Sequence, residues 1–285
     1  MKKYLLLTTA ATLLCTTLSA YSDADMDGVA DSVDKCPNTP LTDLVDINGC
    51  TKKTIKISNT TTKSHYDVII GANYAGSNYS SLNQTDTYSG SLQADYYYGN
   101  FSLQAVTSYY KTDGENYSED GLNDSFVGAA YNIKPTNNFV IRIGAGAILP
   151  TYDTTLNNNK TDYTGSLNLS YTVGKVNLFG GYIYTMINDT DTVDNNVSYT
   201  YHDTNAYSAG LGYYFTNNLY MSAAYNQSDS IYKAIDGASV KDIETASLYG
   251  YYAIDKNHFL NFSYAYGLSD SASDHAASIK LGFYF

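Results

Sequence analysis

The stretch HAASIKLGFYF, residues 275–285, alternates two kinds of side chain. Taken by twos, its apolar side chains fall on one face and its small or polar side chains on the other, as in a β-strand between two different environments. Lys280 lies on the second face between apolar neighbours, so that face must reach water or a partner. The apolar face consists of Ala277, Ile279, Leu281, Phe283 and Phe285.

The same alternation recurs about twelve times from Tyr66 onward, most clearly from Phe139 to Leu149. Connections alternate between short ones, such as Gly99-Asn100, and long ones, such as Pro150 to Lys160. A soluble sandwich has no reason to gather its short turns at one end, whereas a transmembrane barrel has short periplasmic turns and longer outer loops. The sequence therefore predicts an all-β fold over residues 65–285: a transmembrane antiparallel up-and-down β-barrel of about 12 strands, closed because lipid supplies no hydrogen bonds.

Composition agrees with a strand-rich chain of this kind. The 285 residues include 32 Tyr and no Trp, and only 15% are charged. Tyrosine favours strands, and clusters of it at strand ends are typical of the aromatic girdles of membrane barrels. The net charge of -12 argues against nucleic acid as a partner.

The end of the chain also resembles the C-terminal strand of bacterial outer-membrane β-barrels, which ends in an aromatic residue. The resemblance implies that the strand ending at Phe285 is recognised by the outer-membrane assembly machinery. It also implies that outer-membrane lipid surrounds the barrel. A secreted soluble β-protein or a fibre subunit is the alternative.

The first 20 residues predict a secretory signal peptide. Lys2 and Lys3 precede an apolar run from Leu5 to Leu14, and Leu18-Ser19-Ala20 is a suitable cleavage site. Lipidation at Cys15 is the alternative, although the large residue before this cysteine disfavours it. Cleavage after residue 20 leaves a mature protein that begins in an acidic segment.

This acidic segment has the spacing of a calcium loop. Carboxylates stand at positions one, three, five, nine and twelve of a run with glycine at six and a backbone carbonyl at seven. Hard oxygens in this order are what Ca²⁺ requires. No flanking helices are evident, so the loop is not an EF-hand, and an acidic disordered tail is the alternative. The predicted ligands of the Ca²⁺ cofactor are Asp23, Asp25, Asp27, Val29, Asp31 and Asp34.

The mature chain retains two cysteines, Cys36 and Cys50, and an even pair in an exported protein predicts a disulfide. Residues 23–50 as a whole resemble a thrombospondin type 3 repeat, in particular the repeat in linkers of the OmpA family. The resemblance implies a periplasmic calcium-binding repeat over residues 21–50. In that family the repeat precedes a peptidoglycan-binding domain, but here it precedes a linker, residues 51–64, and then the strands, so cell-wall binding is not implied.

The inward face of the predicted barrel is polar and mostly uncharged. Its four charged residues lie near the short-turn ends of their strands, so we expect one charged layer in the periplasmic half of the lumen. This layer is either a mutually neutralising network that braces the barrel or a constriction that filters solutes. We expect Tyr97 and Tyr110 to fill part of the narrow lumen. The charged layer consists of Asp67, Asp95, Arg142 and Lys280.

No catalytic residues are predicted. The chain has four histidines, and none lies on a strand centre with a Ser and an Asn placed to form a nucleophile–base pair. The predicted function is that of a porin-like passive channel for small polar solutes. The alternative is a non-conducting structural or surface-interaction barrel of the outer membrane. The histidines are His65, His202, His258 and His275.

Overall fold

The computed structural model describes residues 35, 64–78, 84–115, 117–152, 159–194 and 196–285. Within these ranges all regular elements are β-strands. In this described part no helix is long and apolar enough to cross a membrane. The predicted signal peptide, the calcium loop with Cys36 and Cys50, and the linker up to residue 63 lie outside the described residues.

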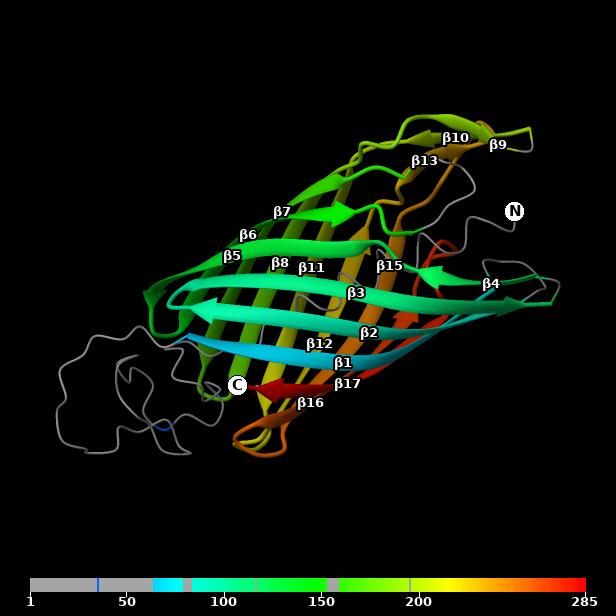
Figure 1. Cartoon of the computed structure of the whole chain (residues 1–285). Helices are drawn as coiled ribbons and strands as arrows, with labels where there is room; N and C mark the ends of the chain where they lie inside the picture. Colours follow the sequence, from blue (N-terminus) through cyan, green and yellow to red (C-terminus); the bar gives the residue numbers. More distant parts are fainter. Residues whose placement is uncertain (1–34, 36–63, 79–83, 116, 153–158, 195) are drawn as a thin grey trace.

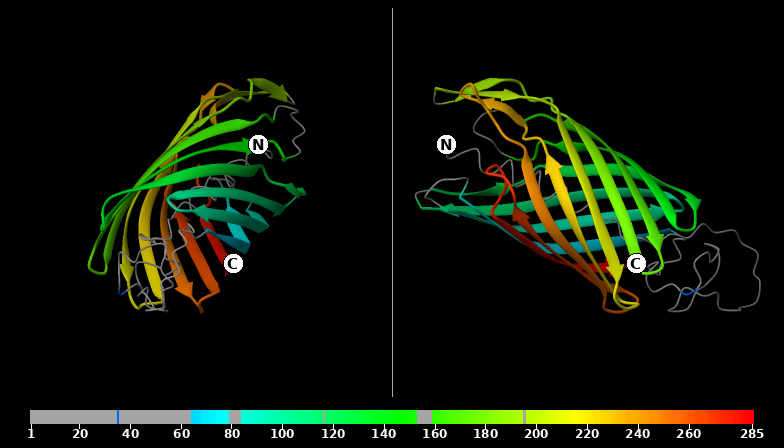
Figure 2. Two further views of the ribbon diagram at one scale, coloured as in Figure 1. Left: turned by 60° about the vertical axis from the view of Figure 1, so that its left-hand side comes forward. Right: turned by 180° about the vertical axis from the view of Figure 1, so that it is seen from behind.

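Antiparallel strands form a closed barrel, which confirms the predicted fold (Figures 1 and 2). The main sheet contains 13 strands, and 12 remain when β4, an extension beside β3, is set aside. The pairing of β1 with β17 on one side and β2 on the other closes the ring. The barrel strands are β1 (Ser64–Ser77), β2 (Thr85–Tyr98), β3 (Phe101–Gly114), β5 (Ser125–Thr136), β6 (Phe139–Leu149), β7 (Asp162–Val173), β8 (Val176–Met186), β11 (Thr204–Tyr214), β12 (Leu219–Ser228), β15 (Ile243–Ala253), β16 (His258–Gly267) and β17 (His275–Tyr284).

The C-terminal strand closes the barrel. The backbone N–H of Tyr66 donates to the carbonyl of Phe285 at 3.2 Å, and the N–H of Phe285 donates to the carbonyl of Tyr66 at 3.0 Å. The two rings stack with centroids 5.1 Å apart. Closure matters because an open sheet edge in lipid would leave a row of backbone groups without hydrogen bonds.

The outer wall carries the apolar side chains. Ile70, Leu211 and Ile279 are 56%, 58% and 54% exposed, respectively, which is the reverse of a soluble protein. Exposed aromatic residues form a girdle at each end of the wall, as in membrane barrels. One girdle, near the short turns, includes Tyr66, Tyr98, Phe101, Tyr131, Tyr171, Phe215 and Phe285; the other, near the long loops, includes Tyr88, Tyr109, Tyr163, Tyr207 and Tyr266.

Several predicted long loops contain strands. β4 (Tyr117–Leu122) pairs with the C-terminal part of β3. A second, four-stranded sheet lies at the same end of the barrel, away from the short turns (Figure 1). It has a hydrophobic core of its own, because Tyr232 is 2% exposed and its ring packs on Tyr199 and Tyr201. The sheet consists of β9 (Thr192–Asp194), β10 (Val197–Tyr201), β13 (Tyr232–Ile235) and β14 (Ala238–Ser239).

Candidate functional site

An aromatic cluster fills one side of the lumen near the short turns. Tyr251 and Phe259 are 5% and 4% exposed and pack with Ile69. The Tyr251 hydroxyl lies 3.0 Å from that of Tyr284, whose ring packs on Phe259 with centroids 4.7 Å apart. Tyr220 and Tyr249 extend the cluster. The wall formed by β1, β12, β15, β16 and β17 is therefore covered by rings on its inner face at this end.

Sequence reasoning expected Tyr97 and Tyr110 to narrow the lumen and overlooked this cluster. Tyr97 stacks on His65, with centroids 4.5 Å apart, on the inner face of β1 and β2. Tyr110 is 2% exposed and packs on Tyr152, near the long loops. The alternation of side chains in β15 could have predicted the cluster, since Tyr249 and Tyr251 fall on the same inward side as Ser247.

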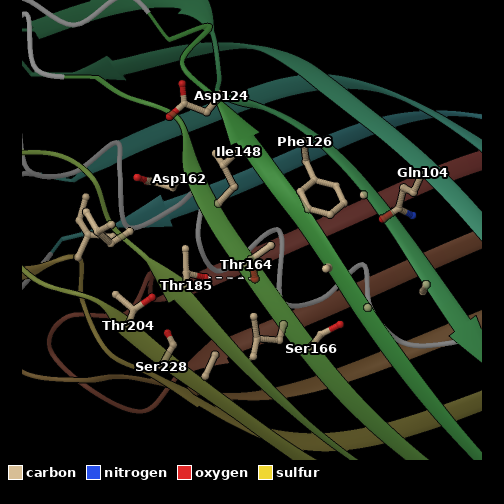
Figure 3. Close-up of a pocket in the computed structure, with 18 of the residues that line it drawn as sticks. Gln104, Asp124, Phe126, Ile148, Asp162, Thr164, Ser166, Thr185, Thr204 and Ser228 are labelled. Carbon is tan, nitrogen blue, oxygen red and sulfur yellow. Dashed lines mark hydrogen bonds between the residues drawn. The ribbon is translucent and has the colours of Figure 1, made fainter.

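The opposite wall bounds a cavity of about 190 Å³. β3, β5, β6, β7, β8 and β11 contribute most of its lining, and its residues change in character along the strands (Figure 3). Asp124 and Asp162 lie at the loop end, with Ile148 and Phe126 further along the wall, and Ser166 beyond them. The cavity thus has an acidic mouth, an apolar middle and a polar floor.

The carboxylates of the mouth hold loops in place. A one-residue bulge between β4 and β5 turns Asp124 inward, because β3 pairs Tyr109 with Leu122 but Val106 with Phe126. Its Oδ1 accepts hydrogen bonds from the N–H of Tyr152 at 2.9 Å and from Asn159 Nδ2 at 2.8 Å. Each of these interactions ties the loop after β6 to the start of β5.

Asp189 has a similar role, since its Oδ1 accepts from the N–H of Lys160 at 2.9 Å. Burial raises the pKa of both Asp124 and Asp189, because removal from water disfavours the charged carboxylate. Both carboxyls therefore act as hydrogen-bond acceptors for the loops that surround the mouth.

The apolar middle is formed by Phe126, Ala130, Ile148 and Ile183. The Phe126 ring lies flat against two inward glycines of the wall. A Cβ on Gly128 would be 2.5 Å from Phe126 Cζ, and one on Gly146 would be 2.4 Å from Cε2. Only glycine leaves room for the ring at the wall, so these two positions keep Phe126 out of the centre of the cavity.

Arg142 and Ser102 form part of the floor, and Arg142 Nη2 donates to Ser102 Oγ at 3.0 Å. Nearby Asp95 is 6% exposed and accepts from two glutamine amides, Gln93 Nε2 at 2.7 Å and Gln104 Nε2 at 3.0 Å. Neither glutamine was singled out by sequence as a partner of the charged residues. The carboxylate is thus satisfied without a direct ion pair to arginine.

The other two predicted members of the charged layer are adjacent to Asp95. Asp67 lies directly opposite Asp95 in the register of β1 and β2 and is 5% exposed. Lys280 lies over Gly71, with its Cγ 2.8 Å from where a glycine Cβ would stand. Both Lys280 and Arg142 attract the Asp95 carboxylate electrostatically. In the part of the chain that the structure describes, no ion pair joins any two of these four residues.

The described residues lack a cluster of metal-binding side chains. They contain no group of three or more His, Cys, Asp or Glu side chains that could hold a metal. His258 pairs with Asp255 in a short turn, and His275 lies against Tyr264 on the outer wall. The predicted calcium ligands fall outside the residues whose positions are known.

The barrel resembles solved outer-membrane channels. The crystal structure of the COG4313 outer membrane channel from Pseudomonas putida F1 superposes with a TM-score of 0.65 at 8% identity, over 81% of this chain and 100% of that chain. The NanC porin gives a TM-score of 0.51 at 14% identity, over 76% and 98%. At these identities the likeness establishes the fold alone.

A short match links the chain to a curated protein, the outer membrane porin F of Pseudomonas aeruginosa. It is 66% identical over 29 residues, which are 10% of this chain and only 8% of that protein. Residues 54–285 match the family model described as "Putative MetA-pathway of phenol degradation". The match includes every strand of the barrel. The chain therefore belongs to this family, and its fold is that of an outer-membrane porin-like barrel.

Proposed function

We propose that this protein is a passive outer-membrane channel for small polar solutes. The cavity within the closed sheet supports this function most strongly, because it continues from the acidic mouth to Arg142 in the half of the lumen that the aromatic cluster leaves free. Ser, Thr and Gln side chains on its walls offer exchangeable hydrogen bonds to a passing solute. By its likeness to channels and porins, the fold also favours passive transport over enzymatic activity.

Single-channel recording of the refolded barrel in planar bilayers tests the proposal. We expect discrete conductance steps, and we expect Arg142→Ala to change their size or their ion selectivity, because the guanidinium is a charge on the floor of the pathway. Lys175→Ala is the matched control, since it removes a cation from a short turn outside the cavity. Bilayers that stay silent with correctly folded protein would contradict a channel.

A non-conducting structural or surface-interaction barrel is the second candidate. The aromatic cluster around Tyr251, Phe259 and Tyr284 favours it, because rings on one side of the short-turn end narrow the exit to the periplasm. The two candidates differ in one measurement. If Tyr251→Ala conducts while the unmodified barrel does not, the cluster is a permanent plug and the second candidate is preferred.

We further propose that residues 21–50 form a periplasmic, calcium-binding thrombospondin type 3-like repeat closed by a Cys36–Cys50 disulfide. The regular spacing of carboxylates supports it, because unscreened acids so close together would repel one another. Calorimetric titration of the mature protein with Ca²⁺ should give a binding heat that Asp27→Ala abolishes. Identical titrations for the two proteins would remove this part of the proposal.

The assembly machinery of the outer membrane is the proposed partner of β17. The exposed Phe285 ring at the end of the closing strand supports this interaction. Phe285→Ala should lower the yield of folded barrel in cells but not in detergent refolding, because only assembly in cells depends on recognition of the strand. Equal losses in both would indicate a purely structural role in the contact with Tyr66.

A further inference from the structure

The floor of the cavity contains an arginine with unused hydrogen-bond donors. Of the several N–H groups of the Arg142 guanidinium, one donates to Ser102 Oγ. Among the described residues no other acceptor binds this side chain, and no carboxylate forms an ion pair with it. Asp95, which Arg142 attracts electrostatically, accepts its hydrogen bonds from the amides of Gln93 and Gln104. The remaining donors of Arg142 are thus available to a ligand in the cavity.

The middle of the cavity is unusual for a pathway that conducts only hydrophilic solutes. Phe126 and Ile148 present apolar side chains between the acidic mouth and Ser166 (Figure 3). Ile183 adds a third apolar side chain to the lining, opposite Ser166 in the register of β7 and β8. The cavity volume of about 190 Å³ exceeds the roughly 150 Å³ of an engineered apolar cavity that binds benzene. There is room for one ring or one short alkyl chain.

We propose that the cavity is a binding site for small carboxylates with an apolar body. The carboxylate would bind Arg142 and Ser102, because a guanidinium offers paired N–H donors with the spacing of carboxylate oxygens. The apolar body would pack between Phe126, Ile148 and Ile183 and leave water. This inference rests on the proposed channel function and specifies the class of solute that the channel selects.

The acidic mouth does not contradict an anionic solute. Asp124 and Asp189 each accept a hydrogen bond from a backbone N–H group of a neighbouring loop. The partial positive charge of the N–H group offsets part of the negative charge of the carboxylate. Burial also raises the pKa of both carboxyls, because removal from water disfavours the charged form.

Calorimetric titration of the detergent-solubilised full-length barrel tests the proposal with three probes. Hexanoate has both features of the predicted ligand, hexanol has only the apolar body, and acetate has only the carboxylate. The variants are Arg142→Met, which removes the charge at similar length, and Ile183→Asn, which makes the apolar middle polar. Lys175→Met is the control, since it removes a cation that does not line the cavity. Heat-modifiable migration in gels verifies that every variant is folded.

We expect hexanoate to bind the unmodified barrel at least tenfold more tightly than either hexanol or acetate. Arg142→Met should weaken hexanoate at least tenfold and leave hexanol unchanged, whereas Ile183→Asn should weaken both. The proposal is overturned if hexanoate binds no better than hexanol, or if a folded Arg142→Met barrel binds it as before. A barrel that conducts KCl but does not bind hexanoate would disprove the binding site and keep the channel function. A barrel that binds hexanoate but does not conduct in bilayers would keep the binding site and disprove the channel function.

Discussion

Gly128 leaves room for the Phe126 ring against the barrel wall, so replacing it should change the conductance of the barrel. A methyl group at this position would lie 2.5 Å from Phe126 Cζ, 2.9 Å from Cε1 and 3.1 Å from the backbone carbonyl oxygen of Ala145. Carbon atoms in ordinary contact are roughly 3.5–4.0 Å apart, so the ring must move by about 1 Å or more. The strand pairing of β5 with β6 blocks movement into the wall, and the open direction is the cavity.

Gly128→Ala should therefore reduce the single-channel conductance, because the displaced ring occupies part of the pathway. We expect an overpacking cost of about 1–3 kcal/mol in the free energy of unfolding. Phe126→Ala should have the opposite effect on conductance. The double variant Gly128→Ala/Phe126→Ala should recover the conductance of Phe126→Ala alone, since the added methyl group then has no ring to displace.

Gly165→Ala is the matched control. Gly165 belongs to β7, and a Cβ there would meet nothing within 4 Å. Its conductance and stability should equal those of the unmodified protein within error. A folded Gly128→Ala barrel with unchanged conductance would refute the reasoning, because it would mean that Phe126 does not border the conducting path.

Three further predictions follow from contacts elsewhere in the barrel. Tyr251→Ala should raise the conductance by removing a ring from the aromatic cluster. Tyr251→Phe should keep the conductance and lose the hydrogen bond to Tyr284, about 1 kcal/mol in urea unfolding of the reconstituted barrel. Gln93→Leu should destabilise the barrel by about 1.5–3 kcal/mol in the same assay, since it withdraws a hydrogen bond from the buried Asp95 carboxylate; no loss would mean that water replaces the amide. Burial raises the pKa of Asp124, so between the ordinary and the raised value the folded protein binds more protons than the unfolded chain. The free energy of unfolding should accordingly fall as the pH rises through that interval, and Asp124→Asn should remove this part of the pH profile; an identical profile in the variant would contradict the assignment.

The alternation of side chains determined the strands, their outward faces and the barrel itself. Alternation is a local property, because successive side chains of any strand point to opposite sides. From it the sequence predicted that Asp67, Asp95, Arg142 and Lys280 point inward, and all four lie on inner faces. Their joint role as a layer stays a prediction. The calcium ligands from Asp23 to Asp34 also stay a prediction, since they lie outside the described residues.

The tertiary structure alone decided which inward side chains meet. Asp95 could have paired with Arg142, but the register of β2 with β3 places Gln104 opposite it, and the guanidinium is left for the cavity. Likewise the rings around Tyr251 gather on one wall and the cavity lies along the other, although both sets of residues show the same inward alternation. The physical reason is that neighbours across a barrel are set by register, stagger and closure, which depend on the pairing of all the strands together.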